Sequence, residues 1–202
     1  MACVLGITGG VGTGKSTVLG IFEELGAHTL SADQIARDVL SKNSPAYREV
    51  VRRFGSGVVQ ADGDIDRSAL AGLVFQDSGA REDLNRITHP RIIERIQERV
   101  DQFRSDPDSS KAVLALEIPL LFECGLESTV DHILVVAAEQ ETQVRRLTTR
   151  SGISRRDALA RIGAQMPLDE KIRRADWVIR NDGTIESLER SAKRIWDGII
   201  LL

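Results

Sequence analysis

Apolar and polar positions recur along the chain with two different periods, and the order of these periods predicts the fold. Five short apolar runs have the length and composition of buried strands: residues 2–8, 27–33, 112–119, 132–138 and 176–181. Between the first two runs, residues 15–25 carry apolar side chains on one helical stripe. A strand, a tight loop, a helix and a strand form a βαβ unit, so we expect these strands to lie parallel in one sheet. The whole pattern predicts a three-layer α/β/α fold around a five-stranded parallel sheet.

The longest interruption of this pattern, residues 34–104, has helical spacing but no convincing buried strand, so we expect a mostly helical insertion. Pro90 should kink or begin a helix instead of lying inside one, because proline has no N–H and its ring collides with the preceding turn. An arginine-rich segment between the fourth and fifth strands predicts two or three helices. Residues 185–200 predict a final amphipathic helix.

Composition and charge narrow the classes of function. The chain has 202 residues, of which 42% are hydrophobic, and its net charge is −3, so we expect no nucleic-acid partner. No apolar run approaches the roughly 20 residues of a membrane span, and the first residues lack the basic region of a signal peptide. Cys3 and Cys124 have no metal-ligand spacing and imply no disulfide framework. We therefore expect a cytoplasmic protein with no membrane partner.

The segment "GGVGTGKS", residues 9–16, fits the pattern G-x-x-x-x-G-K-[ST] between a predicted strand and a predicted helix. Glycines let such a loop curl with its amide N–H groups directed inward to phosphate oxygens, and the following helix adds its N-terminal dipole. Lys15 supplies charge for the β- and γ-phosphates, and Ser16 can ligate Mg²⁺. A glycine-rich surface turn is the alternative, but it does not explain the flanking strand and helix. The segment predicts a P-loop that binds a nucleoside triphosphate with Mg²⁺.

The carboxylate of Asp33 is a candidate to take part in transfer of the terminal phosphoryl group. Asp33 ends the second predicted strand, where it can accept the proton of an attacking hydroxyl group and help to hold Mg²⁺. It can also cap the next helix, and the two roles are compatible. The guanine-reading motif of regulatory GTPases is absent, and Glu117 is the only acid at the end of the third strand, whereas motor ATPases have paired acids there.

Arg146 and Arg150 are four residues apart on a predicted helix, so they share one face. Two arginines on a mobile arm can fold over the phosphates, stabilise developing charge and exclude water. A solvated helix face is the alternative for any such pair. The local excess of basic residues and the position after the fourth strand favour the role at the phosphates.

Seven segments, in this order and spread over most of the chain, resemble the dephospho-coenzyme A kinase family. They are "GITGGVGTGKST" from residue 6, "ADQIAR" from 32, "ITHPRI" from 87, "EIPLLFE" from 117, "QVRRLTTRSG" from 143, "RIGAQMPLDEK" from 161 and "ADWVIRNDGT" from 175. The P-loop alone is shared by a superfamily, whereas "HP", "PLLFE" and the last two segments single out this family.

The resemblance implies transfer of the ATP γ-phosphoryl group to the ribose 3′-hydroxyl of dephospho-coenzyme A, giving coenzyme A and ADP in the last step of coenzyme A synthesis. It also implies the architecture of nucleoside monophosphate kinases. The P-loop core would be residues 1–32, 107–140 and 175–202, the helical acceptor-binding insertion 33–106, and the lid 141–174.

Carried over by position, the resemblance assigns ATP binding to Gly12, Thr13, Gly14, Lys15, Ser16 and Thr17. It assigns catalysis to Lys15, Asp33 as the base, and the lid residues Arg146 and Arg150. It assigns Mg²⁺ binding to Ser16 and Glu117.

Two positions depart from the family's pattern. Ser31 replaces the first Asp of Asp-Ala-Asp, which removes a carboxylate with a role in metal or acceptor binding, while Asp33 keeps the second. Glu117 stands where the family tends to Asp. It keeps the carboxylate but reaches about one methylene farther, which a water-mediated contact with Mg²⁺ can absorb.

The remaining candidates each have a second interpretation. His89 is a candidate contact of the acceptor, or a local hydrogen-bonding residue. Leu121 and Phe122 are candidates to line the acceptor pocket, although an aromatic residue after an apolar run is usually part of the core. Asn181 and Gly183 either read adenine through backbone groups or form an Asx turn. A kinase for another nucleotide or sugar, and an NTP-dependent switch, are the competing functions, and we expect a monomer or small homo-oligomer.

Overall fold

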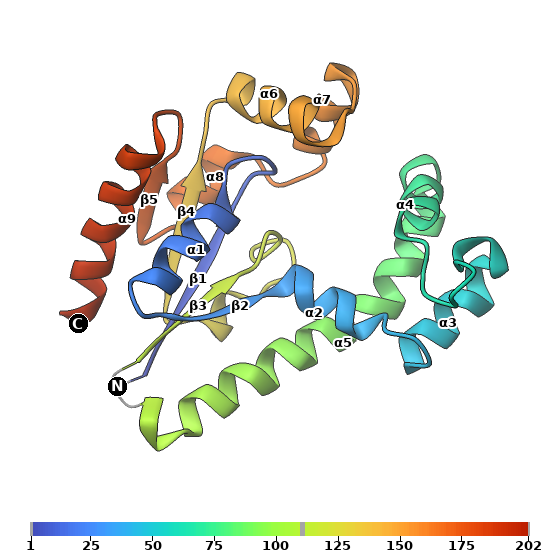
Figure 1. Ribbon diagram of the computed structural model, residues 1–202, viewed down its shortest axis with the longest axis horizontal. Helices are drawn as coiled ribbons and strands as arrows, with labels where there is room; N and C mark the ends of the chain where they lie inside the picture. Colours follow the sequence, from blue (N-terminus) through green and yellow to red (C-terminus); the bar gives the residue numbers. More distant parts are fainter. Residues whose placement is uncertain (1, 110–111, 202) are drawn as a thin grey trace. The chain divides into compact units, whose positions relative to one another are not determined.

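The computed structural model describes residues 2–109 and 112–201, which divide into two compact units (Figure 1). The sheet unit comprises Met1–Ser31 and Val100–Leu202, and the helical unit comprises Ala32–Arg99. Helix α5 (Ser78–Ser105) crosses this boundary, so its last turn and a half belongs to the sheet unit. None of the helices in the described ranges is long and apolar enough to cross a bilayer.

The sheet unit is built on five parallel strands in the order β2-β3-β1-β4-β5. Their bounds are β1 (Cys3–Gly9), β2 (His28–Ser31), β3 (Val113–Glu117), β4 (His132–Ala137) and β5 (Trp177–Arg180). All five predicted strands are confirmed, and β1 and β2 are parallel in one sheet, with β3 between them. In the register, Ile7 is paired with Glu117 on one side and Leu134 on the other, which brings the ends of β1 and β3 together.

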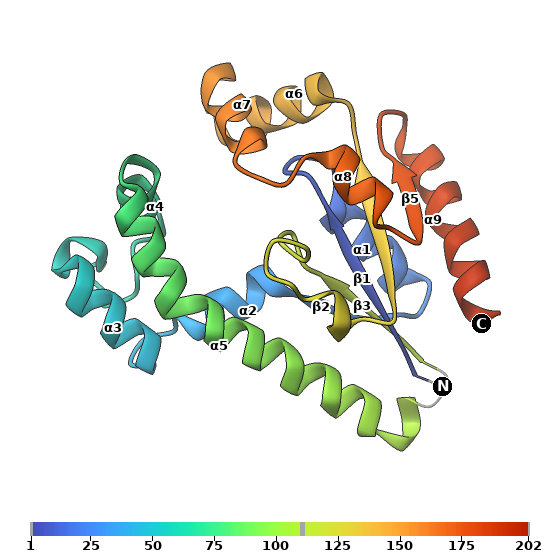
Figure 2. The ribbon, with the colours of Figure 1, turned by 180° about the vertical axis from the view of Figure 1, so that it is seen from behind.

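Alternating side chains of the strands bury one face of the sheet under α1 (Lys15–Glu24) and α9 (Ile185–Ile200). This core contains Leu5, Ile7, Val18, Phe22, Ala27, Val113, Ala115, Leu134, Val136, Ile179, Leu188, Ala192 and Ile199. Burying a side chain such as Phe22 contributes about 1.5–3 kcal/mol. On the other face α8 (Leu168–Arg173) packs beside β4, as seen from behind in Figure 2. The three-layer α/β/α fold is therefore confirmed.

The helical unit has a core of its own. The unit contains α2 (Ala32–Val39), α3 (Pro45–Phe54), the short 3-10 turn Ser56–Val58, α4 (Arg67–Gln76) and most of α5. Ser44 and Asp66 cap the first turns of α3 and α4 by accepting hydrogen bonds from backbone N–H groups. The buried hydrophobic cluster at its centre consists of Leu40, Ala46, Val50, Val58, Ile65 and Leu70. The prediction of a mostly helical segment is confirmed.

The prediction for Pro90 is wrong, because Pro90 lies inside α5. Two side chains nearby donate hydrogen bonds to carbonyl groups within the helix. Thr88 Oγ1 donates to the carbonyl of Leu84 at 2.9 Å, and Arg91 Nη1 donates to the carbonyl of Ile87 at 2.5 Å. Neither carbonyl is the one that the missing proline N–H leaves without its helical donor, which is that of Arg86, four residues before Pro90.

The arginine-rich segment forms three helices: α6 (Gln140–Ser151), α7 (Arg155–Gly163) and α8. Gly152 ends α6 with a φ of +63°, and Ser154 caps α7. Val144, Leu147 and Ala158 join α6 to α7 in a small core that also receives Val11 from the P-loop. These helices belong to the sheet unit. Two further 3-10 turns are Pro107–Ser109 and Glu127–Thr129.

Candidate active site

Several positions of the P-loop require glycine, because their backbone conformation disfavours a side chain or because neighbouring atoms leave no room for one. Gly12 and Gly14 have φ values of +76° and +94°, in the region that side chains disfavour. A Cβ atom at Gly14 would lie 2.2 Å from Nδ2 of Asn181, and one at Gly9 would lie 2.1 Å from the carbonyl oxygen of Val136. Gly14 is also the N-cap residue of α1, so its conformation sets where the helix begins.

Side-chain donors hold the carbonyl groups of the P-loop. The carbonyl of Gly10 accepts from Thr13 Oγ1 at 2.9 Å and from Lys15 Nζ at 2.8 Å. The carbonyl of Thr13 accepts from Asn181 Nδ2 at 2.8 Å. Arg146 Nη1 lies 3.3 Å from the carbonyl oxygens of both Gly12 and Thr13. The loop therefore cannot turn these carbonyls toward a bound anion without breaking bonds.

Three backbone amides of the same loop have no such partner. Within residues 2–109 and 112–201, the N–H groups of Gly12, Gly14 and Ser16 donate to no protein acceptor. They precede or begin α1, whose N-terminus carries a partial positive charge. Thr17 is exposed in the first turn of the same helix, and Thr13 is fully buried below it. Free amides, a helix N-terminus and Lys15 together make a cradle for phosphate oxygens.

The two residues predicted to bind metal are in contact. Ser16 Oγ donates to Glu117 Oε1 at 3.0 Å, although the two residues are 101 positions apart. Glu117 is 5% exposed, at the end of β3. In the described part of the chain no group of three or more His, Cys, Asp or Glu side chains could hold a metal ion. A hydroxyl and a carboxylate beside a phosphate cradle nevertheless suit Mg²⁺, which keeps most of its other ligands as water and phosphate oxygens.

The two arginines predicted to belong to a lid have different surroundings. Arg146 is half-buried, and its Nη2 donates to the backbone carbonyl of Asn181 at 2.9 Å, in addition to its contacts with the P-loop. Arg150 lies one turn later on α6 and is exposed. The guanidinium of Arg146 thus joins the P-loop to the end of β5, from the side of the loop where the carbonyls are.

The predicted base, Asp33, lies in the helical unit, as does His89. Asp33 is exposed in the first turn of α2. Because α2 begins at Ala32, Asp33 does not occupy the N-cap position, and the capping interpretation is wrong in that respect. His89 is half-buried in α5, and burial lowers the pKa of its imidazole below the ordinary value.

The two residues of "PLLFE" predicted to line an acceptor pocket are both buried. Leu121 has no exposed surface, and a Cβ atom at Gly6 of β1 would lie 2.8 Å from its Cδ1. Phe122 is 6% exposed, and the guanidinium of Arg174 lies 4.4 Å from the centre of its ring. Both side chains take part in the packing of the sheet unit.

Several residues around the P-loop received no role from the sequence. Gln143, at 3% exposure, donates to the carbonyl of Ala138, while its Oε1 has no partner in the described structure. Gln165 accepts from the N–H of Val11 at 2.8 Å. Lys171 is fully buried and pairs with Glu123 at 2.8 Å. All except Ala138 stand in segments that carry the family resemblance, and that is the only signal by which they could have been found.

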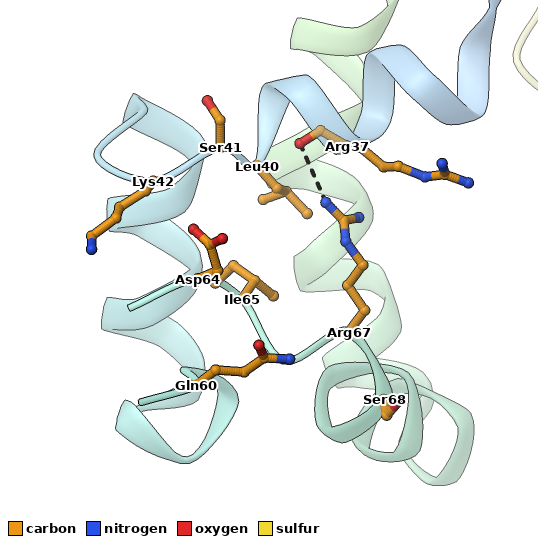
Figure 3. Close-up of a pocket in the computed structure, with 9 residues that line it drawn as sticks. All are labelled: Arg37, Leu40, Ser41, Lys42, Gln60, Asp64, Ile65, Arg67 and Ser68. Carbon is orange, nitrogen blue, oxygen red and sulfur yellow. Dashed lines mark hydrogen bonds between the residues drawn. The ribbon is translucent and has the colours of Figure 1, made fainter. Parts of the chain in front are cut away.

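A hollow of about 420 Å³ lies within the helical unit (Figure 3). Its lining includes three cationic side chains, Arg37, Lys42 and Arg67, and one carboxylate, Asp64. Figure 3 shows Arg37 and Lys42 pointing away from one another, and Lys42 donates to the carbonyl of Asp62. Because the cations do not converge, this hollow lacks the geometry of a triphosphate cradle.

Comparisons with known proteins agree with this geometry. The dephospho-CoA kinase family model matches residues 3–187. The dephospho-CoA kinase of Bacillus thuringiensis subsp. konkukian is 45% identical over 185 residues, which are 92% of this chain and 91% of that protein. Among solved structures, TT1252 from Thermus thermophilus has 39% identity and a TM-score of 0.78, with 97% of each chain covered. The dephospho-CoA kinase from Campylobacter jejuni has 27% identity and a TM-score of 0.73 over 98% of this chain and 97% of that one. The chain belongs to the dephospho-CoA kinase family.

Proposed function

We propose that the P-loop and the ends of β3 and β5 bind Mg²⁺-ATP, and that the helical unit binds the acceptor. As a dephospho-CoA kinase, the chain transfers the ATP γ-phosphoryl group to the ribose 3′-hydroxyl of dephospho-CoA in the last step of coenzyme A synthesis. The observation that carries the assignment of the ATP site is a P-loop whose carbonyls are held by side chains, while the N–H groups of Gly12, Gly14 and Ser16 have no acceptor in the part of the chain that the structure describes.

In this proposal Gly12 to Thr17 bind the triphosphate of ATP. The amides of Gly12, Gly14 and Ser16 contact phosphate oxygens, and Lys15 neutralises charge on the β- and γ-phosphates as transfer proceeds. Lys15 already lies against the loop, since its Nζ donates to the carbonyl of Gly10.

We assign Mg²⁺ to Ser16 and Glu117, whose oxygen atoms are 3.0 Å apart. When bound, the ion neutralises charge on the β- and γ-phosphates. Glu117 replaces the aspartate that the family tends to have, and its longer side chain reaches Ser16 directly from the end of β3. The carboxylate then holds the Ser16 hydroxyl at the edge of the cradle.

Asp33 is proposed as the base. Its carboxylate accepts the proton of the acceptor hydroxyl as that oxygen forms a bond to the γ-phosphorus and the bond to the ADP oxygen breaks. The side chain is exposed at the start of α2, directly after β2 ends, so it is accessible to an acceptor. The helical unit supplies the remaining acceptor contacts, with His89 and the cation-lined hollow beside Arg37 and Arg67 as candidates.

Replacing Arg146 by alanine should lower kcat by about tenfold to a hundredfold and weaken ATP binding less. The guanidinium holds the carbonyls of Gly12, Thr13 and Asn181, so its loss loosens the loop that aims the γ-phosphate. Steady-state kinetics with a separate measurement of ATP affinity resolve the two effects. The exposed neighbour Arg145 provides the control, Arg145→Ala. An Arg146→Ala enzyme with weaker ATP binding but parental kcat would show that the residue serves binding only.

An assay of ADP release with a panel of acceptors tests the function. Purified protein with Mg²⁺ and ATP should release ADP rapidly with dephospho-CoA, and slowly with adenosine, AMP or a simple sugar. Rapid release with another nucleotide or sugar would favour a kinase of different acceptor specificity. Equal release with no acceptor would favour an NTP-dependent switch.

The remaining properties are also proposals. ATP and the precursors of coenzyme A are available in the cytoplasm, which supports that location. The net charge of −3 argues against a nucleic-acid partner. All the residues assigned to ATP belong to one chain, so a monomer or small homo-oligomer is sufficient.

A further inference from the structure

Two consecutive residues after α7 link the P-loop to the segment after β3, residues 118–126, which we call the β3 loop. Gln165 Oε1 accepts a hydrogen bond from the backbone N–H of Val11 in the P-loop at 2.8 Å. The backbone N–H of Met166 donates to Oε1 of Glu123 in the β3 loop at 3.0 Å. One short stretch of chain therefore contacts both segments.

A buried cation strengthens the second contact. Lys171 in α8 has no exposed surface; its Nζ lies 2.8 Å from Glu123 Oε1 and donates to the carbonyl of Pro119 at 3.0 Å. That carbonyl also accepts from Thr8 Oγ1 in β1 at 3.2 Å. A buried ammonium group without a counter-ion is strongly unfavourable, so Lys171 and Glu123 constrain each other. The β3 loop is thereby held to α8 and to the strand that leads into the P-loop.

The contact at Gln165 does not bind phosphate. A side-chain carbonyl oxygen is an acceptor, and it repels the acceptor oxygens of a phosphate group. What the bond does is to fix the orientation of the peptide group at Val11, in the first half of the P-loop. The side chain of Val11 also packs into the apolar core between α6 and α7. The hydrogen bond therefore orients a peptide group whose residue is already in contact with these helices.

We propose that Gln165, Glu123 and Lys171 are positioning residues that keep the P-loop and the β3 loop in a fixed relation during phosphoryl transfer. This proposal rests on the assignment of ATP to the P-loop given above. The P-loop aims the γ-phosphate, and the β3 loop continues directly from Glu117, whose carboxylate holds Ser16. Transfer requires the reacting atoms to approach within about 3–3.5 Å in line, so a small loss of alignment slows the reaction more than it weakens binding.

The variant Gln165→Met tests the first contact. Methionine has similar length and no acceptor for the Val11 N–H, and Gln165 is only half-buried, so the chain should fold. We expect kcat to fall about tenfold, the effect of one lost hydrogen bond at the loop, while the KM values for ATP and dephospho-CoA change less than about twofold. Gln102→Met, at an exposed position of α5, is the matched control. Parental kcat in Gln165→Met, or a raised KM for ATP with parental kcat, would overturn the proposal.

A second variant tests whether the contacts act together. Glu123→Gln with Lys171→Met removes the ion pair and leaves neither charge uncompensated. If the contacts act as one unit, the triple variant, with Gln165→Met added, has a kcat no lower than that of Gln165→Met or of the ion-pair variant, whichever of the two is slower. Independent contacts would multiply, giving about a hundredfold loss if each change alone costs tenfold, and would overturn the proposal. If the ion-pair variant fails to fold, the kcat and KM values of Gln165→Met alone still support or overturn the proposal.

The same experiments separate this inference from the proposed function. If the unmodified chain binds no Mg²⁺-ATP in the P-loop, the assignment of the ATP site itself fails. If the unmodified chain is an active kinase that binds ATP there and Gln165→Met matches it in every constant, only the positioning role fails.

Discussion

Replacing Gly14 by alanine should weaken ATP binding by about a hundredfold or more and remove most kinase activity. The φ of +94° costs an alanine about 1–2 kcal/mol, and the new Cβ would lie 2.2 Å from Asn181 Nδ2. Asn181 would have to move and give up its bond to the carbonyl of Thr13, at a further cost of about 1 kcal/mol. The loop can escape this strain only by changing the shape of the cradle. Titration of Mg²⁺-ATP by calorimetry measures the loss.

Gly20→Ala is the matched control for this substitution. Gly20 lies inside α1, and a Cβ atom there meets nothing within 4 Å. Alanine in a helix interior should raise the free energy of unfolding by about 0.5–1 kcal/mol and leave ATP affinity unchanged. Parental ATP affinity in Gly14→Ala would mean that the strained turn is not part of the nucleotide site.

Replacing Asp33 by asparagine should lower kcat by a hundredfold or more, while ATP affinity changes less than about threefold. A positioned general base contributes about 10² to 10⁴ in rate, and asparagine cannot accept the proton. The phosphate cradle belongs to other residues, so it remains intact. Steady-state kinetics with dephospho-CoA and a direct measurement of ATP binding test both parts of this expectation.

Asp38→Asn is the control for the Asp33 variant, since Asp38 is a second exposed carboxylate on the same helix. It should retain parental kcat, because its side chain accepts from Gln34 within α2. A parental kcat in Asp33→Asn would remove the assignment of the base and leave the acceptor hydroxyl to be activated by another group.

Local features of the fold were predictable from the sequence because local residues determine them. The glycines of residues 9–14, the lysine and the following helical stripe specify the P-loop without help from distant residues. The five strands were likewise predictable as short apolar runs. Strands β1, β3 and β4 are buried along most of their length, whereas the edge strands β2 and β5 are partly exposed. Because the strands were expected to be parallel, it followed that their carboxyl ends lie at the same edge of the sheet.

Contacts between distant residues were not predictable in this way. Arg146 was expected over the phosphates, but its guanidinium contacts carbonyls of Gly12 and Thr13, more than 130 positions away. Spacing on a helix says which side chains share a face, and it does not say what lies opposite that face. The prediction for Pro90 was wrong for a related reason, because the local cost of a proline does not include the packing of the whole helix α5, in which Ile96 and Val100 are buried farther along.

The position of Glu117 shows how a departure from the family's pattern can be accommodated. The register pairs Glu117 with Ile7 in β1, two residues before β1 ends at the P-loop. From there the longer side chain reaches the Ser16 hydroxyl directly. Ser31 has no comparable compensation, since serine cannot supply the charge of an aspartate at the end of β2.

Transfer of the terminal phosphoryl group directly from ATP to an alcohol is tested most directly by the fate of γ-labelled phosphate. With Mg²⁺, labelled ATP and dephospho-CoA, we predict one labelled 3′-phosphate on coenzyme A for each ADP formed, and almost no labelled inorganic phosphate. Label released mainly as inorganic phosphate, at the same rate with and without dephospho-CoA, would contradict this mechanism.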